Sequence, residues 1–149
     1  MTICHAAAVN YRTRLGWRAH VVGTTVWLTP GGRVEAFNVP RDVGERTLTK
    51  LLTLDIRPPV INIPGPPDRW ALLTQSYDGA VGDLVALCAE HDIGYAYSGH
   101  HDGQSSEWGI DLPPTRHPGH DALSWVTQSD TPLPPAGVVV HTLISVLRQ

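Results

Sequence analysis

The chain switches repeatedly between helical and strand periodicity, and glycine or proline turns stand at many of the switches. Apolar residues at helical spacing predict helices over residues 2–15, 42–54 and 78–93, and a terminal helix started by residues 134–135. Short apolar runs predict strands over residues 19–22, 25–29, 34–39, 59–63, 69–75, 94–98, 108–112 and 122–126. This order of elements predicts an α+β fold, in which helices pack against a mixed, mostly antiparallel sheet.

The length of 149 residues matches one ordinary domain, so we expect residues 1–149 to share a single core. No segment approaches the ~20 consecutive apolar residues of a membrane helix, and we expect no membrane partner. The first residues carry no basic patch ahead of an apolar run, which predicts a cytoplasmic chain without a secretory signal. The net charge of -3 argues against strong non-specific binding to nucleic acids, because that affinity comes mostly from phosphate neutralisation. The oligomeric state stays open.

Two motifs near the ends of the chain occur in a specific order. The opening helix leads into Leu15-Gly16-Trp17, and residues 108–119 read Trp-Gly-Ile-Asp-Leu-Pro-Pro-Thr-Arg-His-Pro-Gly, with Trp125 and a proline-rich exit downstream. In this order the motifs resemble the N-terminal prim-pol domain of bifunctional DNA primase/polymerases, in the archaeo-eukaryotic primase superfamily. The resemblance extends along most of the chain and implies an RRM-like sheet that carries catalytic acids.

Members of that family that transfer nucleotides need paired carboxylates on a strand, because two divalent ions must be held close together. The corresponding strand here covers residues 34–39, where Glu35 supplies one carboxylate and Asn38 stands where a second is expected. An amide carries no charge to offset a divalent cation. The resemblance therefore implies a degenerate catalytic site at Glu35 and Asn38, with no resident metal and no cofactor.

A second family motif places a histidine after a tight turn, where it contacts the incoming triphosphate. The equivalent turn here spans residues 63–70 and puts Arg69 or Trp70 at that position. Arg69 can pair with a phosphate bidentately, although a surface arginine beside a buried Trp70 explains the same residues. Together with Arg116 and His117 of the Pro-Pro-Thr-Arg-His turn, these residues form the predicted nucleotide-binding set.

The preserved framework and the missing acid predict a catalytically degenerate prim-pol-like domain, with a binding or regulatory role toward a nucleotide, a nucleic acid or a protein partner. A second hypothesis is a metal-dependent nucleotidyltransferase, in which Glu35 holds Mg or Mn together with Asp102 or Asp111. A third is a small-molecule enzyme or binding protein that has reused the same cleft.

The histidines of two neighbouring loops have a composition that suits zinc or another transition metal: His100, His101, His117 and His120. Their spacing is not a reliable zinc pattern, and neither cysteine lies near them in the sequence. Polar loop residues are the simpler interpretation. The sequence leaves metal binding by these loops open.

Overall fold

The computed structural model describes residues 2–29, 34–97, 110–128 and 130–149. Their helices are α1 (Ile3–Arg14), α2 (Arg41–Thr53), α3 (Val81–Glu90) and α4 (Ala136–Leu147). Their strands are β1 (Ala19–Val22), β2 (Thr25–Leu28), β3 (Glu35–Pro40), β4 (Val60–Ile63), β5 (Arg69–Thr74), β6 (Gly94–Ala96), β7 (Ile110–Leu112) and β8 (Ser124–Trp125). The predicted α+β class is confirmed. None of the described helices has the length and apolar character that crossing a membrane requires.

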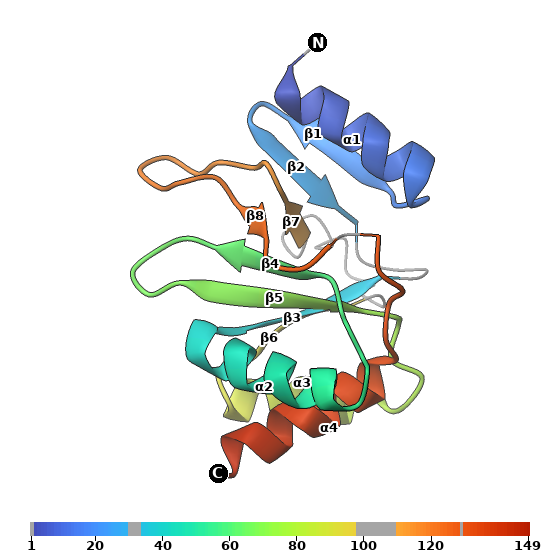
Figure 1. The fold of residues 1–149 in the computed structure, drawn as a ribbon, viewed down its shortest axis with the longest axis vertical. Helices are drawn as coiled ribbons and strands as arrows, with labels where there is room; N and C mark the ends of the chain where they lie inside the picture. The colour runs from blue at the N-terminus through green and yellow to red at the C-terminus, as the bar shows by residue number, and fades with distance from the viewer. Residues whose placement is uncertain (1, 30–33, 98–109, 129) are drawn as a thin grey trace.

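The strands form two antiparallel sheets, which lie one above the other in Figure 1. A three-stranded sheet has the order β1-β2-β7, and a five-stranded sheet has the order β6-β3-β5-β4-β8. The two strands predicted over residues 59–63 and 69–75 form a hairpin, in which β4 pairs with β5 from Val60 opposite Leu72 to Ile63 opposite Arg69. Pairing of β2 with β7 joins the N-terminal part of the chain to the segment that begins at residue 110.

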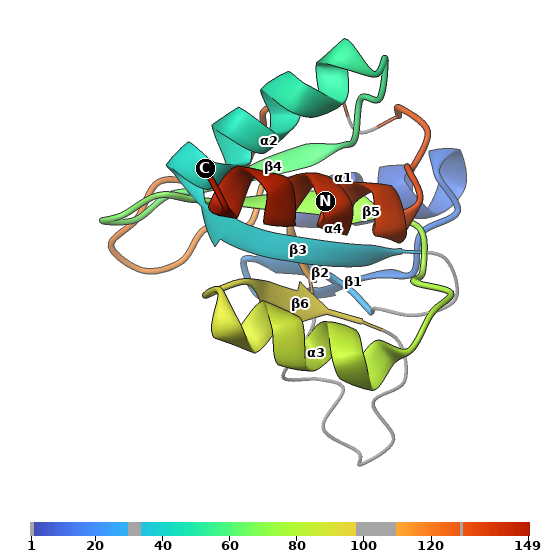
Figure 2. The same cartoon turned by 90° about the horizontal axis from the view of Figure 1, so that it is seen from below.

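The five-stranded sheet is covered on both faces. Helices α2, α3 and α4 lie on one face, and α1 with the three-stranded sheet lies on the other (Figures 1 and 2). Phe37 and Val39 of β3 belong to the core under the helices, together with Leu143 of α4. Ala36 belongs to the other core, together with Leu112 of β7. Because side chains alternate along a strand, a residue's position in β3 decides which layer it serves.

The residues that carry the prim-pol resemblance converge on Tyr11 of α1. Its hydroxyl donates to the carbonyl oxygen of Pro113 at 2.5 Å and accepts from Nε1 of Trp125 at 3.1 Å. The ring of Tyr11 stacks on that of Trp17, with centroids 5.7 Å apart. Burial raises the pKa of the Tyr11 hydroxyl, which therefore stays a neutral donor at physiological pH. These contacts join the opening helix, the Gly-Trp turn, the Pro-Pro turn and β8 into one cluster.

Two helices begin at residues that differ from the prediction. The second helix was expected to begin at residue 42, but α2 begins at Arg41 with Pro40 at the N-cap position and no side-chain cap. Proline has a fixed φ that suits the start of a helix, which allows the earlier beginning. Within the first turns of α2, Glu45 pairs with Arg41 at 2.8 Å. Helix α3 begins at Val81 rather than at residue 78.

Candidate functional site

A cleft of about 540 Å³ lies between the two sheets, with walls from β3, β4, β5, β6, β7 and the end of α3. Small and aliphatic side chains form its apolar part: Ala36, Ala71, Ala96, Ile63 and Ile110. Its polar part consists of Asn38, Arg69, Asp92 and Asp111. Pockets that bind small molecules have volumes of roughly 300–1,000 Å³ and combine an apolar lining with a few polar groups. This cleft therefore has the size and lining of a ligand site.

The strand register keeps the cleft open around Asn38. Asn38 lies between Gly94 of β6 and Ala71 of β5, and Ala36 lies opposite Ala96. A Cβ at Gly94 would approach Cβ of Asn38 to 3.2 Å, so a larger residue there would crowd the asparagine. Small residues on the flanking strands thus leave the amide of Asn38 accessible to its polar neighbours.

Arg69, at the start of β5, is fixed at the polar end of the cleft. Its Nε donates to Oδ1 of Asn38, and its Nη2 donates to the backbone oxygens of Asn38 at 3.1 Å and Asp92 at 3.0 Å. Its Nη1 lies 3.4 Å from Oδ2 of Asp92. The Arg69 side chain is 28% exposed, and its guanidinium joins β5 to β3 and to the turn after α3. The structure therefore places the predicted phosphate contact Arg69 inside the cleft, in a defined orientation.

Glu35 lies on the other face of β3, away from the cleft. Its side chain is 1% exposed and accepts hydrogen bonds from the hydroxyl of Tyr95 at 2.6 Å and from the backbone N–H of Tyr77 at 2.9 Å. Burial raises the pKa of Tyr95, and the hydrogen bond to Glu35 raises it further. Residues three apart in a strand point to opposite faces, so the structure does not bring Glu35 and Asn38 together as one degenerate acid pair.

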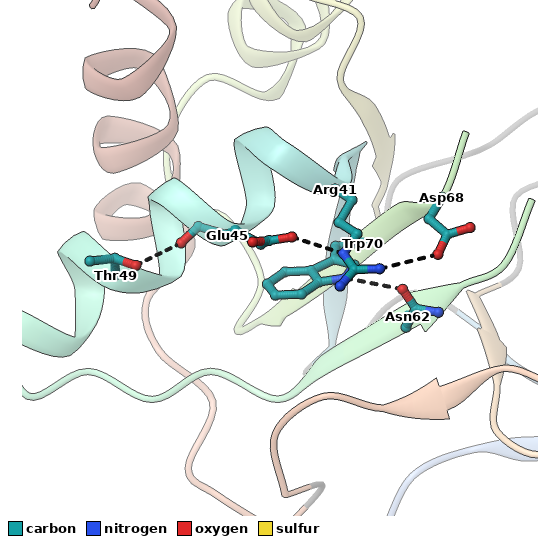
Figure 3. A network of polar contacts seen from close by, with 6 residues as sticks. All are labelled: Arg41, Glu45, Thr49, Asn62, Asp68 and Trp70. Carbon is teal, nitrogen blue, oxygen red and sulfur yellow. Dashed lines mark hydrogen bonds and ion pairs between the residues drawn. The ribbon is translucent and has the colours of Figure 1, made fainter. Parts of the chain in front are cut away.

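Trp70 also points away from the cleft, because it follows Arg69 in the strand. It is 6% exposed under α2, and its Nε1 donates to Oδ1 of Asn62 at 3.1 Å (Figure 3). A Cβ added to Gly44 of α2 would lie 2.8 Å from Cε3 of Trp70, so the helix approaches the ring closely. Of the two residues predicted at this turn, Arg69 is in the cleft and Trp70 is in the core.

In the turn after β7, the side chains of Arg116 and His117 lie at different sites. Nε2 of His117 lies 2.9 Å from Oδ2 of Asp111, so the ring donates to a carboxylate that lines the cleft. Arg116 is exposed and donates from Nε to the backbone oxygen of His120 at 3.2 Å. It lines a different hollow of about 580 Å³, beside the turn at residues 64–68. His117 thus contacts the edge of the cleft through Asp111, whereas Arg116 lies outside the cleft.

Metal binding was expected under the nucleotidyltransferase hypothesis, and the sequence left it open for the loops that carry His100, His101, His117 and His120. Across residues 2–29, 34–97, 110–128 and 130–149, no group of three or more His, Cys, Asp or Glu residues is placed to hold a metal ion. His100, His101 and Asp102 lie outside the described residues. Asp111 lines the cleft, but its proposed metal partner Glu35 does not. The described residues therefore do not assemble the Glu35 and Asp111 metal pair.

Sequence reasoning missed Asp92 and Cys88, which both line the cleft. Asp92 follows α3 with a φ of 56°, and a polar residue at the end of a predicted helix, two positions before a glycine, is the signal that could have drawn attention to it. Burial raises the pKa of the Cys88 thiol to about 11, so the thiol stays protonated at physiological pH. Asp92 thus places a negative charge next to Arg69, and Cys88 adds an uncharged side chain to the lining of the cleft.

The fold and the cleft define a two-sheet α+β domain with a ligand-sized site between its sheets. No protein-family model, curated protein or solved structure matches this chain. The geometry of the cleft is therefore the basis for proposing a function.

Proposed function

We propose that this chain is a prim-pol-like domain that no longer transfers nucleotides and instead binds a nucleotide, in a regulatory role, in the cleft between its sheets. The observation that carries the proposal is the fixed guanidinium of Arg69 at the polar end of a cleft of about 540 Å³. A guanidinium is always charged and its planar set of donors matches phosphate oxygens. An arginine held by its own protein loses little side-chain entropy when an anion arrives.

The apolar end of the cleft supports the same class of ligand. Ala36 and Ala96 lie directly opposite each other on neighbouring strands, two residues along from the row that contains Ala71, Asn38 and Gly94. Short side chains on adjacent strands present a low, flat surface, which suits a planar ring. A ligand with a ring at one end and an anionic group at the other can use both ends of the cleft. A mononucleotide has that shape and charge distribution.

The positions of the carboxylates favour binding over transfer. Glu35 is held by Tyr95 and Tyr77 on the far face of β3, and the described carboxylates of the cleft each have a basic neighbour. Asp111 accepts from His117, and Asp92 lies beside Arg69. Two-metal transfer needs carboxylates that converge on the ions, so this arrangement is better suited to holding a ligand.

We test the proposal by calorimetric titration of the chain with ATP, in EDTA and in manganese. Arg69→Ala is expected to weaken ATP binding by at least about tenfold, because a charged hydrogen bond contributes roughly 1.5–3 kcal/mol. Arg41→Ala is the matched control, since Arg41 is also ion-paired, at 2.8 Å from Glu45 (Figure 3), and is not among the residues that line the cleft. Binding in EDTA that depends on Arg69 and not on Arg41 supports the proposal.

Two other outcomes would favour a different function. ATP binding that requires manganese, together with primer extension that Glu35→Ala abolishes, would favour the nucleotidyltransferase hypothesis. A protein partner that stays bound at high salt would favour protein recognition, because phosphate-driven binding to nucleic acid weakens steeply with salt. We also propose a cytoplasmic location, in which the two free cysteines, Cys4 and Cys88, stay reduced.

A further inference from the structure

Asp92 occupies an unusual backbone position next to the cleft. It follows the C-cap of α3 and has a φ of 56°, in the left-handed region. Glycine is the usual residue at this position, because a Cβ makes the conformation costly, and aspartate is one of the few alternatives. Asp55 after α2 has the same conformation, with a φ of 59°. The two aspartates therefore share a backbone setting, but only Asp92 lines the cleft.

The backbone and the side chain of Asp92 hold Arg69 differently. The backbone oxygen accepts from Nη2 of Arg69 at 3.0 Å, whereas the carboxylate lies 3.4 Å from Nη1. Well-formed hydrogen bonds between a guanidinium and a carboxylate are about 2.7–2.9 Å long. The Asp92 side chain is also 81% exposed. The backbone oxygen of Asp92 thus holds Arg69 through a well-formed hydrogen bond, whereas its carboxylate is only a loosely held counter-ion. The carboxylate faces Nη1, the terminal nitrogen of Arg69 that makes no hydrogen bond to Asn38.

We propose that the carboxylate of Asp92 is a built-in competitor, which the anionic group of the ligand displaces from Nη1 of Arg69. The inference rests on the proposed function, because it assigns regulation to the same site. A phosphoryl group carries more negative charge and more acceptor oxygens than a carboxylate, so it can displace Asp92. A monocarboxylate only exchanges one carboxylate for another. Asp92 therefore makes the cleft selective for phosphorylated ligands and lowers its affinity for all anions.

The test compares Asp92→Asn with Asp55→Asn in calorimetric titrations with ATP and with adenosine, in EDTA at low ionic strength. We expect Asp92→Asn to bind ATP about three- to tenfold more tightly than the wild-type chain, since an exposed ion pair contributes up to about 1 kcal/mol and a repulsive charge is also removed. Adenosine has no phosphate, so its affinity is expected to stay unchanged. Asp55→Asn is expected to change neither affinity.

Two further variants keep the outcome interpretable. Asp92→Gly removes the carboxylate while favouring the left-handed backbone, so it is expected to give the same gain if Asp92→Asn is poorly folded. The double variant Arg69→Ala with Asp92→Asn is expected to show no gain, because the subsite is lost.

The failures of the two proposals differ. If ATP binds through Arg69 but Asp92→Asn and Asp92→Gly bind it with equal or lower affinity, the competitor role is wrong and the nucleotide-binding function stands. If neither the wild-type chain nor the Asp92 variants bind ATP more tightly than adenosine, both proposals are wrong.

Discussion

Replacement of Glu35 by alanine tests whether this acid supports the core or the ligand site. The side chain is 1% exposed and accepts from Tyr95 at 2.6 Å and from the backbone of Tyr77 at 2.9 Å. Its removal leaves a buried hydroxyl and a backbone N–H without that partner, at roughly 1–3 kcal/mol each. We therefore expect Glu35→Ala to lower the free energy of unfolding by about 3–5 kcal/mol, which is a large part of the roughly 5–15 kcal/mol of an ordinary domain.

The assay is urea unfolding followed by tryptophan fluorescence. With a slope of about 2 kcal/mol per molar urea for a chain of this size, the unfolding midpoint is expected to fall by about 2 M. Tyr95→Phe provides a double-mutant cycle: it is expected to destabilise the wild-type chain by about 1–2 kcal/mol and the Glu35→Ala variant by clearly less. The folded Glu35→Ala protein is expected to bind ATP as the wild-type chain does, because the carboxylate lies on the far face of β3.

One result would refute this reasoning. If Glu35→Ala shifted the midpoint by less than about 0.5 M and still weakened ATP binding tenfold, Glu35 would act on the ligand and not in the core. The placement of the cleft on the opposite face of β3 would then be wrong.

Two further predictions concern stability. A Cβ at Gly44 would lie 2.8 Å from Trp70, so Gly44→Ala is expected to lower the free energy of unfolding by about 1–3 kcal/mol. Gly82 has open space around it, so Gly82→Ala is expected to raise the free energy of unfolding by about 0.5 kcal/mol. Both variants are measured in the same urea titration. Burial, and then Glu35, raise the pKa of the Tyr95 hydroxyl in the folded chain above its ordinary value of 10.0. Above pH 10 the unfolded chain therefore releases this proton while the folded chain keeps it. The stability that Tyr95 contributes is complete below pH 10 and is lost as the pH rises further. The free energy of unfolding of the wild-type chain is expected to fall above pH 10 by about 1.4 kcal/mol per pH unit more than that of Tyr95→Phe, and equal slopes would contradict the raised pKa.

Local signals predicted most of the elements of this fold. Helix α1 and strands β1 and β2 end within a residue or two of the prediction, because Gly16, Gly23 and the proline at residue 30 punctuate the chain. The division into two sheets was not predicted. It depends on pairing between β2 and β7, which are far apart in the sequence, and periodicity contains no information about such partners. The nearby sequence determines whether a segment forms a strand, whereas the partner of that strand depends on distant segments of the chain.

The candidate site was predictable only in part. Arg69 was predicted, and the structure places it in the cleft. Trp70 could have been excluded, because adjacent residues of a strand point to opposite faces. The same alternation separates Glu35 from Asn38, whose odd spacing already argues against a shared site. Asp92 could not be assigned from sequence, since its contact with Arg69 depends on how the end of α3 meets β5.

The residues behind the prim-pol resemblance explain why framework and chemistry have to be judged separately. Trp17, Pro113 and Trp125 meet at the hydroxyl and ring of Tyr11, and this cluster joins α1 to the turn after β7 and to β8. Their buried aromatic contacts constrain the sequence through packing, whatever happens in the cleft. The cleft is lined by different residues, among them Asn38, Arg69 and Asp92. These motifs therefore report on the packing of the framework, and only measurements at Arg69 and Asp92 report on the cleft itself.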